Sequence, residues 1–341
     1  MSPSHMAREV AEIPEAAARF LDLSAADVGR AAAALRDRDP GVIATVARGS
    51  SDHAAAYLKY AIELTAGVPV ASVGPSVASI YGRPLRLAGG ACIGISQSGR
   101  SPDIVDMMRT AGQGGALSIA ITNHADSPMA AASGHTLALR AGEEKSVAAT
   151  KTFVNSVVAG LALIAAWQQD ADLRRAVQTL PQALQAAVGM GWGALSDRLA
   201  RAGSAFVLGR GPSHAIAAEA ALKMKETSGL HAEAYSAAEV LHGPAAIVQA
   251  GFPVLVLGVG DAALPQVVAT AERLVAQGAD VFLTGAAAAG ATTLPSVAGL
   301  HPLVAPLALI ASYYACVEGL ARRRGLDPDA PPHLRKVTET R

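Results

Sequence analysis

This sequence of 341 residues contains few cysteines, no surplus of charge of either sign and no long hydrophobic runs. Its two cysteines, Cys92 and Cys316, each lie inside an apolar pattern, which is typical of core residues in a reducing compartment and not of a disulfide framework. The 28 lysines and arginines balance the 28 aspartates and glutamates. The sequence therefore gives no basic surplus that would predict nucleic acid as a partner.

The missing hydrophobic runs exclude a membrane span. The longest apolar segments, such as residues 157–167, are too short to cross a bilayer, so we expect no membrane partner. Residues 1–5 show no basic segment followed by an apolar core, and we expect a cytoplasmic protein. The nine histidines include no convincing pair at metal-ligand spacing, so we predict no metal. Gly209-Arg210-Gly211 begins like a dinucleotide fingerprint, but His214 stands at the third glycine, and we expect no cofactor.

What the chain does contain is a regular alternation of short apolar runs with helical patterns. Residues 8–38 predict one or two helices before the first strand. The predicted strands follow at residues 42–47, 68–73, around Cys92, and at 116–121, 136–139, 204–209, 253–257 and 280–284. This alternation predicts an α/β fold, with parallel sheets flanked by helices in a flavodoxin-like, three-layer αβα arrangement.

The second half of the chain repeats the first. Without gaps, the series Arg48, Gly49, Ser51, Ala55, Ala56, Thr65, Gly67 aligns with Arg210, Gly211, Ser213, Ala217, Ala218, Thr227, Gly229. This indicates an internal duplication. We divide the chain into an N-terminal helical segment (1–40), a first domain (41–171), a second domain with its preceding helix (172–326) and a tail (327–341). Prolines in the tail predict an extended strap on the surface of another unit.

A serine-rich loop, residues 95–102 with the sequence Ile-Ser-Gln-Ser-Gly-Arg-Ser-Pro, follows the apolar run around Cys92 and precedes a helical pattern. Backbone N–H groups and hydroxyls at the positive end of a helix form an anion site, although an ordinary polar turn is an open alternative. The corresponding loop of the second half is Gly258-Val259-Gly260-Asp261. Anion binding is therefore expected in the first half, beyond the carboxyl ends of the strands.

The titratable residues belong to the second half. Glu219, Lys223 and Glu226 recur at helical spacing and share one face, which fits either a solvated ion-pair stripe or a set of catalytic groups. His242 lies in a His-Gly-Pro turn, where an imidazole has either a structural role or a role in proton transfer near neutral pH.

Five ordered motifs together carry a family resemblance that runs from about Val42 to Thr340. They are residues 48–51, Ser96-Gln97-Ser98-Gly99, Val147-Ala148-Ala149-Thr150-Lys151-Thr152-Phe153, the block from Lys223 to Pro244, and Leu334-Arg335-Lys336. The chain resembles the isomerase half of glucosamine-fructose-6-phosphate aminotransferase, which is built from two sugar isomerase (SIS) domains. It resembles the stand-alone SIS-type glucosamine-6-phosphate deaminases more closely.

The resemblance implies a role for each matching residue. Glu226 would transfer a proton between C1 and C2 of the sugar, and His242, contributed by a neighbouring subunit, would open the sugar ring. Lys336 would meet the open-chain sugar. The resemblance thus implies a homodimer with shared active sites. The residues implied in binding the sugar phosphate are Ser51, Ser96, Gln97, Ser98, Ser101, Val147 and Lys223.

Two departures from the aminotransferase pattern favour a deaminase. Only about forty residues precede the first strand, with Ser2 after the initiator, so we expect no use of glutamine through a glutaminase domain. Ala149 stands where the aminotransferase has a serine. We therefore expect conversion of glucosamine 6-phosphate to fructose 6-phosphate and ammonia. The alternatives are an aldose-ketose isomerase or deglycase acting on another phosphorylated sugar, and a non-catalytic sugar-phosphate sensor.

Overall fold

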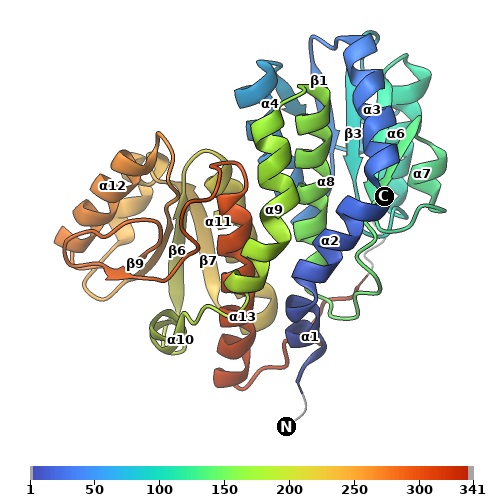
Figure 1. Cartoon of the computed structure of the whole chain (residues 1–341). Helices are drawn as coiled ribbons and strands as arrows, with labels where there is room; N and C mark the ends of the chain where they lie inside the picture. The colour runs from blue at the N-terminus through green and yellow to red at the C-terminus, as the bar shows by residue number, and fades with distance from the viewer. Residues whose placement is uncertain (1–2, 337–341) are drawn as a thin grey trace. The chain divides into compact units, whose positions relative to one another are not determined.

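The computed structural model describes residues 3–336 and divides the chain into two compact units (Figure 1). What we call the first unit contains residues 13–144 and 151–179, together with Arg335 and Lys336 of the tail. The second unit contains the segments up to Glu12, from Lys145 to Thr150 and from Leu180 to Leu334. The domain limits expected from the sequence stay predictions.

The first unit is built on a parallel sheet with the strand order β2-β1-β3-β4-β5. The strands are β1 (Ile43–Val46), β2 (Val70–Ser72), β3 (Ala91–Ile95), β4 (Leu117–Thr122) and β5 (His135–Ala138). Its helices are α2 (Ile13–Leu23), α3 (Ala25–Arg38), α4 (Ser50–Ala66), α5 (Ser76–Ser79), α6 (Pro102–Gln113), α7 (Pro128–Ala131), α8 (Lys151–Trp167) and the start of α9 (Ala171–Ala187). Methionines of α6 pack on strand residues such as Val46 and Cys92, while α3 and α4 pack against α8.

The second unit repeats this plan with the order β10-β9-β8-β6-β7. Its strands are β6 (Ser204–Gly209), β7 (His231–Ser236), β8 (Pro253–Leu257), β9 (Asp280–Leu283) and β10 (Thr292–Thr293). Its helices are α1 (His5–Ala11), α10 (Gly193–Leu199), α11 (Pro212–Ser228), the short 3-10 helices η1 (Glu239–His242) and η2 (Pro244–Ile247), α12 (Leu264–Ala276) and α13 (Ala305–Arg323). Helix α12 covers one face of the sheet, and α11, backed by α13, packs on β6, β7 and β8.

The backbone confirms the duplication read from the sequence. Gly49 before α4 has φ 55° and ψ −132°, and Gly211 before α11 has φ 59° and ψ −136°. Residues other than glycine rarely adopt this backbone conformation. Both helices contain 17 residues, and both end at a left-handed glycine, Gly67 and Gly229. The predicted fold class, two tandem α/β domains with parallel sheets, is therefore confirmed.

Three local features differ from the sequence predictions. The N-terminal segment forms three helices and not one or two, because the helical pattern is interrupted at Glu12 and Ser24. Strand β7 was not predicted, because its sequence His-Ala-Glu-Ala-Tyr-Ser is poor in strand-forming residues and occupies a half-exposed sheet edge. Strand β10 has only two residues, too few for a recognisable pattern.

The two cysteines are core residues, as their apolar surroundings in the sequence predict. Cys92 and Cys316 are buried free thiols, and burial raises the pKa of each to about 12.

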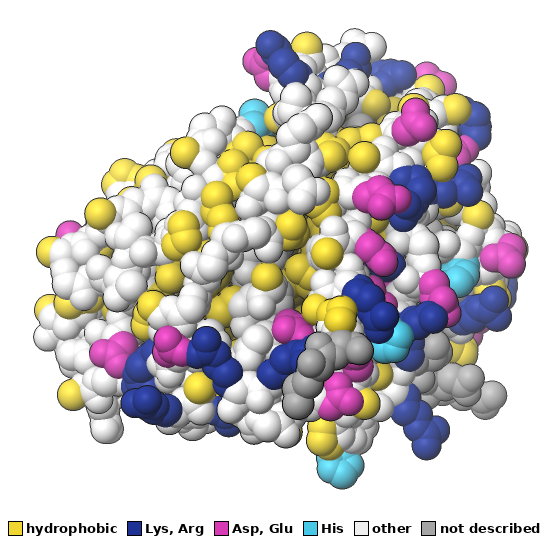
Figure 2. Space-filling view, turned by 60° about the horizontal axis from the view of Figure 1, so that its bottom comes forward, with side chains coloured by type: hydrophobic (Ala, Val, Ile, Leu, Met, Phe, Trp, Pro, Cys, Tyr) yellow, Lys and Arg dark blue, Asp and Glu magenta, His cyan; other side chains and the backbone are white. Residues whose placement is uncertain are grey.

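No helix within the described residues has the length and apolarity needed to cross a membrane. On the face shown in Figure 2, lysine and arginine side chains are interspersed with aspartate and glutamate side chains, so this face carries no extended field of one sign.

Candidate active site

The serine loop connects β3 to α6, and Gly99 gives it its shape. The Ser96 hydroxyl accepts a hydrogen bond from the backbone N–H of Gly99 (3.1 Å), which closes a tight turn. Gly99 has a φ of +62°, and a side chain there would collide with Ser127. The loop therefore requires glycine both for its backbone conformation and for its close approach to Ser127.

The loop that follows β1 lies at the same sheet edge, because β1 and β3 are adjacent parallel strands. Arg48 in that loop forms an ion pair with the fully buried carboxylate of Asp103 in the first turn of α6 (2.6 Å). This ion pair ties the two loops together. Ser51 lies in the first turn of α4, and Ser101 is the N-cap residue of α6, where its hydroxyl makes no capping hydrogen bond. Both hydroxyls are thus placed at helix N-termini, where anions are favoured.

Gln97, Ser98 and Lys336 share one cavity of about 630 Å³ in the first unit. The cavity is predominantly lined by polar and charged side chains, namely Arg19, Gln97, Ser98, Arg100, Asn123, His124, Arg140, Glu143, Glu144 and Lys336, together with Gly142. Asn123 fixes its rim by accepting from the N–H of Ala141 and donating to the carbonyl of Gly142. Such a lining suits a phosphorylated, hydroxyl-rich ligand.

The equivalent region of the second unit has a different character. The loop at residues 258–260 borders a cavity of about 520 Å³, whose lining contains no lysine, arginine, histidine or carboxylate. Of these two cavities, the one in the first unit is lined by basic side chains and the one in the second unit is not; anion binding in the first unit stays a prediction.

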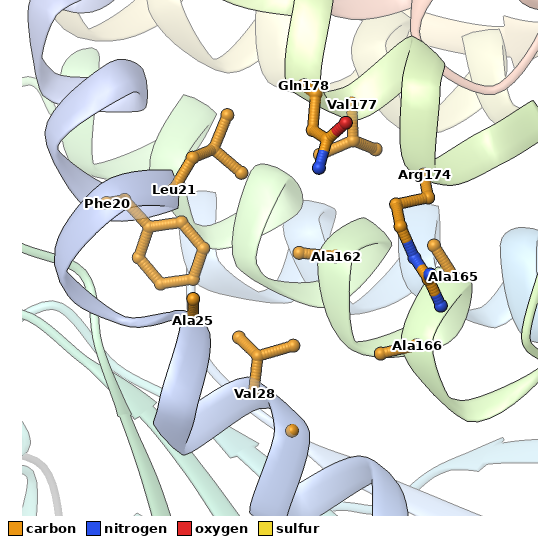
Figure 3. Close-up of a pocket in the computed structure, with 11 residues that line it drawn as sticks. Phe20, Leu21, Ala25, Val28, Ala162, Ala165, Ala166, Arg174, Val177 and Gln178 are labelled. Atoms are coloured by element: carbon orange, nitrogen blue, oxygen red, sulfur yellow. The ribbon is translucent and has the colours of Figure 1, made fainter. Parts of the chain in front are cut away.

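Figure 3 shows another cavity of the first unit, of about 200 Å³, between α2, α3, α8 and α9. Its lining is mostly apolar, with four alanines beside Phe20, Leu21, Val28 and Val177, and it carries Arg174 and Gln178 from α9. No carboxylate or histidine lines it, so it offers no acid-base group, and we interpret it as an imperfection of helix packing.

Glu219, Lys223 and Glu226, which share one face of α11, are mostly buried, so the solvated-stripe interpretation is wrong. The Lys223 ammonium lies 3.3 Å from Glu219 and 2.5 Å from Glu226, and the exposed fractions of the three side chains are 1%, 0% and 22%. The hydroxyl of Tyr314 in α13 donates to Glu219 (3.0 Å). Burial alone would lower the pKa of Lys223, but the two carboxylates together raise it above its ordinary value. Glu226 is the member of this cluster that reaches solvent.

His242 and Val147 also lie in the second unit. His242 is exposed at the end of η1, which is anchored through the buried side chain of Val240, and Gly243 follows it with a φ of +136°. Val147 lies in the segment 145–150, whose start is held by hydrogen bonds from backbone N–H groups to the buried carboxylate of Glu9. The N–H of Val147 donates to the carbonyl of Asp329 (3.4 Å).

The structure also adds residues that the sequence analysis missed. Asp103 and Glu144 are buried carboxylates that hold Arg48 and Lys336, respectively, and Tyr314 supports Glu219. No spacing rule links these pairs, because their members lie far apart in the sequence. Within residues 3–336, no group of three or more histidine, cysteine or carboxylate side chains could hold a metal ion; the absence of a metal stays a prediction.

Comparison with known proteins identifies the family. The family model for the SIS domain matches residues 38–166 and 198–293, so the chain belongs to the SIS-domain family, the family of phosphosugar isomerases. A glutamine–fructose-6-phosphate aminotransferase (isomerizing) of Aeropyrum pernix is 32% identical over 355 residues, which cover 98% of this chain and 57% of that protein. The chain thus spans little more than half the length of the curated relatives that it matches.

Solved structures agree with this assignment. A candidate phosphosugar isomerase from Silicibacter pomeroyi DSS-3 is 54% identical, with a TM-score of 0.93 over 96% of this chain and 100% of that one. The C-terminal domain of glucosamine-fructose-6-phosphate aminotransferase from Francisella tularensis is 26% identical, with a TM-score of 0.86 over 97% and 99% of the two chains.

A glucosamine-6-phosphate deaminase from Thermotoga maritima shares the fold, with 20% identity and a TM-score of 0.79 over 99% and 100% of the chains. The relation to the isomerase half of the aminotransferase is therefore confirmed, and the deaminase has the same fold as this chain. The closer likeness to the deaminases is not supported by these values, since the aminotransferase domain matches better in both identity and TM-score.

Proposed function

We propose that this protein is an isomerase that deaminates glucosamine 6-phosphate, giving fructose 6-phosphate and ammonia. The observation that carries the proposal is the cluster on α11, where the partly exposed carboxylate of Glu226 is held 2.5 Å from the buried ammonium of Lys223. A carboxylate fixed in this way can accept a proton from one carbon and return it to the next. The fixed ammonium beside it can stabilise negative charge that develops during the transfer.

The serine loop supplies the other half of the proposal. Its hydroxyls and backbone N–H groups, at the start of α6, would bind the 6-phosphate, and the basic cavity that includes Lys336 would receive the sugar. A phosphate lies far from the reacting carbons, so its binding energy can be used to position them.

The proposed reaction proceeds in three steps. His242 shuttles a hydroxyl proton as the ring opens, which exposes the C1 aldehyde. Glu226 then removes the proton from C2 and delivers it to C1, while a second proton passes from the C2 amine to the C1 oxygen. The C1 aldehyde thus becomes a hydroxymethyl group, and the C2 amine becomes an imine. Water adds to this imine, the C2 nitrogen leaves as ammonia, and the C2 carbonyl of fructose 6-phosphate remains.

A homodimer with shared active sites is part of the proposal, because the family resemblance assigns the histidine to a neighbouring subunit. The exposed position of His242 supports this, since a residue that serves another subunit must lie at the surface. We also propose that Ala149, which replaces a serine of the aminotransferase pattern, favours release of ammonia over its incorporation.

The experiment that tests the proposed function incubates the purified chain with glucosamine 6-phosphate and follows ammonia and ketose phosphate together. We expect both products in equal amounts, and neither from glucosamine without phosphate. Ketose formation from another sugar phosphate, without ammonia, would favour the aldose-ketose isomerase instead. Tight binding of the sugar phosphate without any product would indicate the non-catalytic sensor.

A further inference from the structure

A buried carboxylate contacts the tail lysine, and nothing in the family resemblance assigns it a role. We propose that Glu144 is a positioning residue that fixes the Lys336 ammonium at the cavity beside the serine loop. The catalytic part of this inference rests on the proposed function, in which Lys336 meets the open-chain sugar. The contact itself does not depend on that function.

Glu144 is well suited to be a fixed point. Its side chain is fully buried, and it accepts hydrogen bonds from the backbone N–H (3.2 Å) and the hydroxyl (2.5 Å) of Thr152. Thr152 lies in the first turn of α8, where the helix dipole stabilises a negative charge. Because the carboxylate is attached to a helix terminus, it cannot follow the motion of a flexible partner.

Lys336, in contrast, needs an external anchor. Its Nζ atom lies 3.3 Å from Glu144 Oε2, and 26% of its side chain is exposed. Within its described part, the tail contains no helix or strand after α13 ends at Arg323. A lysine side chain has a flexible stem of four carbons and considerable rotamer entropy. Without a partner, the ammonium would therefore sample much of the cavity.

A second carboxylate holds the tail further upstream. Asp329 accepts hydrogen bonds from the backbone N–H groups of His5 (2.7 Å) and Met6 (2.8 Å) at the start of α1, within the second unit. Asp329 therefore fixes the backbone of the tail, whereas Glu144 fixes the charged end of Lys336. The two contacts have separate consequences, and only the second acts at the cavity of the serine loop.

The direct test is competitive acetylation of the full-length chain with acetic anhydride at fixed pH, quantified by mass spectrometry. The exposed Lys225 serves as internal reference. Compared with the unmutated chain, we expect Glu144→Gln to acetylate Lys336 faster by about fivefold, as expected for the loss of a partly exposed ion pair. Glu143→Gln removes the same charge from the lining of the same cavity and should leave the Lys336 rate within about twofold.

A kinetic arm separates positioning from simple stabilisation. With glucosamine 6-phosphate, Glu144→Gln should lower kcat and leave KM nearly unchanged, because the phosphate contacts remain. In a chain that already carries Lys336→Ala, the same substitution should have no further effect on kcat. Glu144→Asp keeps the charge but shortens its reach, so both readouts should be intermediate; this variant replaces Glu144→Gln if the latter does not fold.

The outcomes distinguish the two proposals. An unchanged Lys336 acetylation rate in the folded Glu144 variants would overturn the inference, whatever their activity. A faster rate in a chain with no deaminase activity would support the contact and contradict the proposed function. Full additivity of the Glu144 and Lys336 substitutions in kcat would overturn the positioning role.

Discussion

Glu226→Gln is expected to lower kcat/KM for the hexosamine phosphate by about 10²–10⁴-fold, the range typical for loss of a positioned acid-base group. The amide keeps the size of the carboxylate and an oxygen that can accept from Lys223, so the fold and the binding of substrate should survive. The measurement follows, by proton NMR in D₂O, the exchange of the hydrogen on C2. We expect no detectable exchange in the variant.

A matched control comes from β7 of the same unit. Glu233 is a partly buried carboxylate that accepts a hydrogen bond from Tyr235 (2.9 Å) and lies outside the α11 cluster. Glu233→Gln should therefore leave the rate of C2 exchange within about threefold of that of the unmutated protein, because substitutions away from the site usually have small effects. Exchange at the normal rate in Glu226→Gln would refute the assignment of this carboxylate as the proton carrier.

Lys223→Met is expected to destabilise the fold by about 3–5 kcal/mol, the usual cost of breaking a buried ion pair by removing one partner. The reason is that the fully buried carboxylate of Glu219 would lose the ammonium that compensates its charge. Urea unfolding measures the change. Lys225→Met, on the exposed side of the same helix, should change the free energy of unfolding by less than about 0.5 kcal/mol.

The pH dependence of this difference follows from the direction of the pKa shift. Because the pKa of Lys223 is higher in the folded protein than in the unfolded chain, its contribution is complete below the unfolded pKa of about 10.4 and is lost as the pH rises through the folded pKa. Buried Tyr57 and Tyr313, whose pKa values burial also raises, weaken the fold in the same alkaline range.

The stability difference between Lys223→Met and the unmutated protein should accordingly be constant from about pH 6 to pH 9 and shrink above about pH 10.4. A difference that already disappears near neutral pH would mean that Lys223 is uncharged in the folded protein. It would thus contradict the charged cluster on which the proposed proton transfer depends.

The sequence predicted those parts of the fold that local patterns encode. The repeated unit of strand, glycine turn and helix around Gly49 and Gly211 is visible because the glycines have the same conformational requirement in both halves. The serine loop was likewise predictable, since its place between an apolar run and a helix is a local feature. The loop after β1, at residues 48–51, and the serine loop after β3 lie at the carboxyl edge of a parallel sheet, the place expected for a binding site.

Contacts between distant segments could not be predicted. The spacing of Glu219, Lys223 and Glu226 gives a common helix face, but only the packing of α13 on α11 shows that most of this face is buried. Likewise, 192 residues separate Glu144 from Lys336, and no periodicity connects them. Burial and long-range pairing determine which of several charged residues can act in chemistry, and both arise from tertiary structure.

The central claim is a division of labour between the serine loop, which binds the phosphate, and Glu226, which moves the proton. The most direct test is calorimetric titration of glucosamine 6-phosphate into two variants. We predict that Glu226→Gln binds the sugar phosphate with nearly normal affinity and releases no ammonia, whereas a double Ser96→Ala, Ser98→Ala variant loses most of its affinity. Normal binding by the serine variant, or loss of binding by Glu226→Gln, would contradict this account.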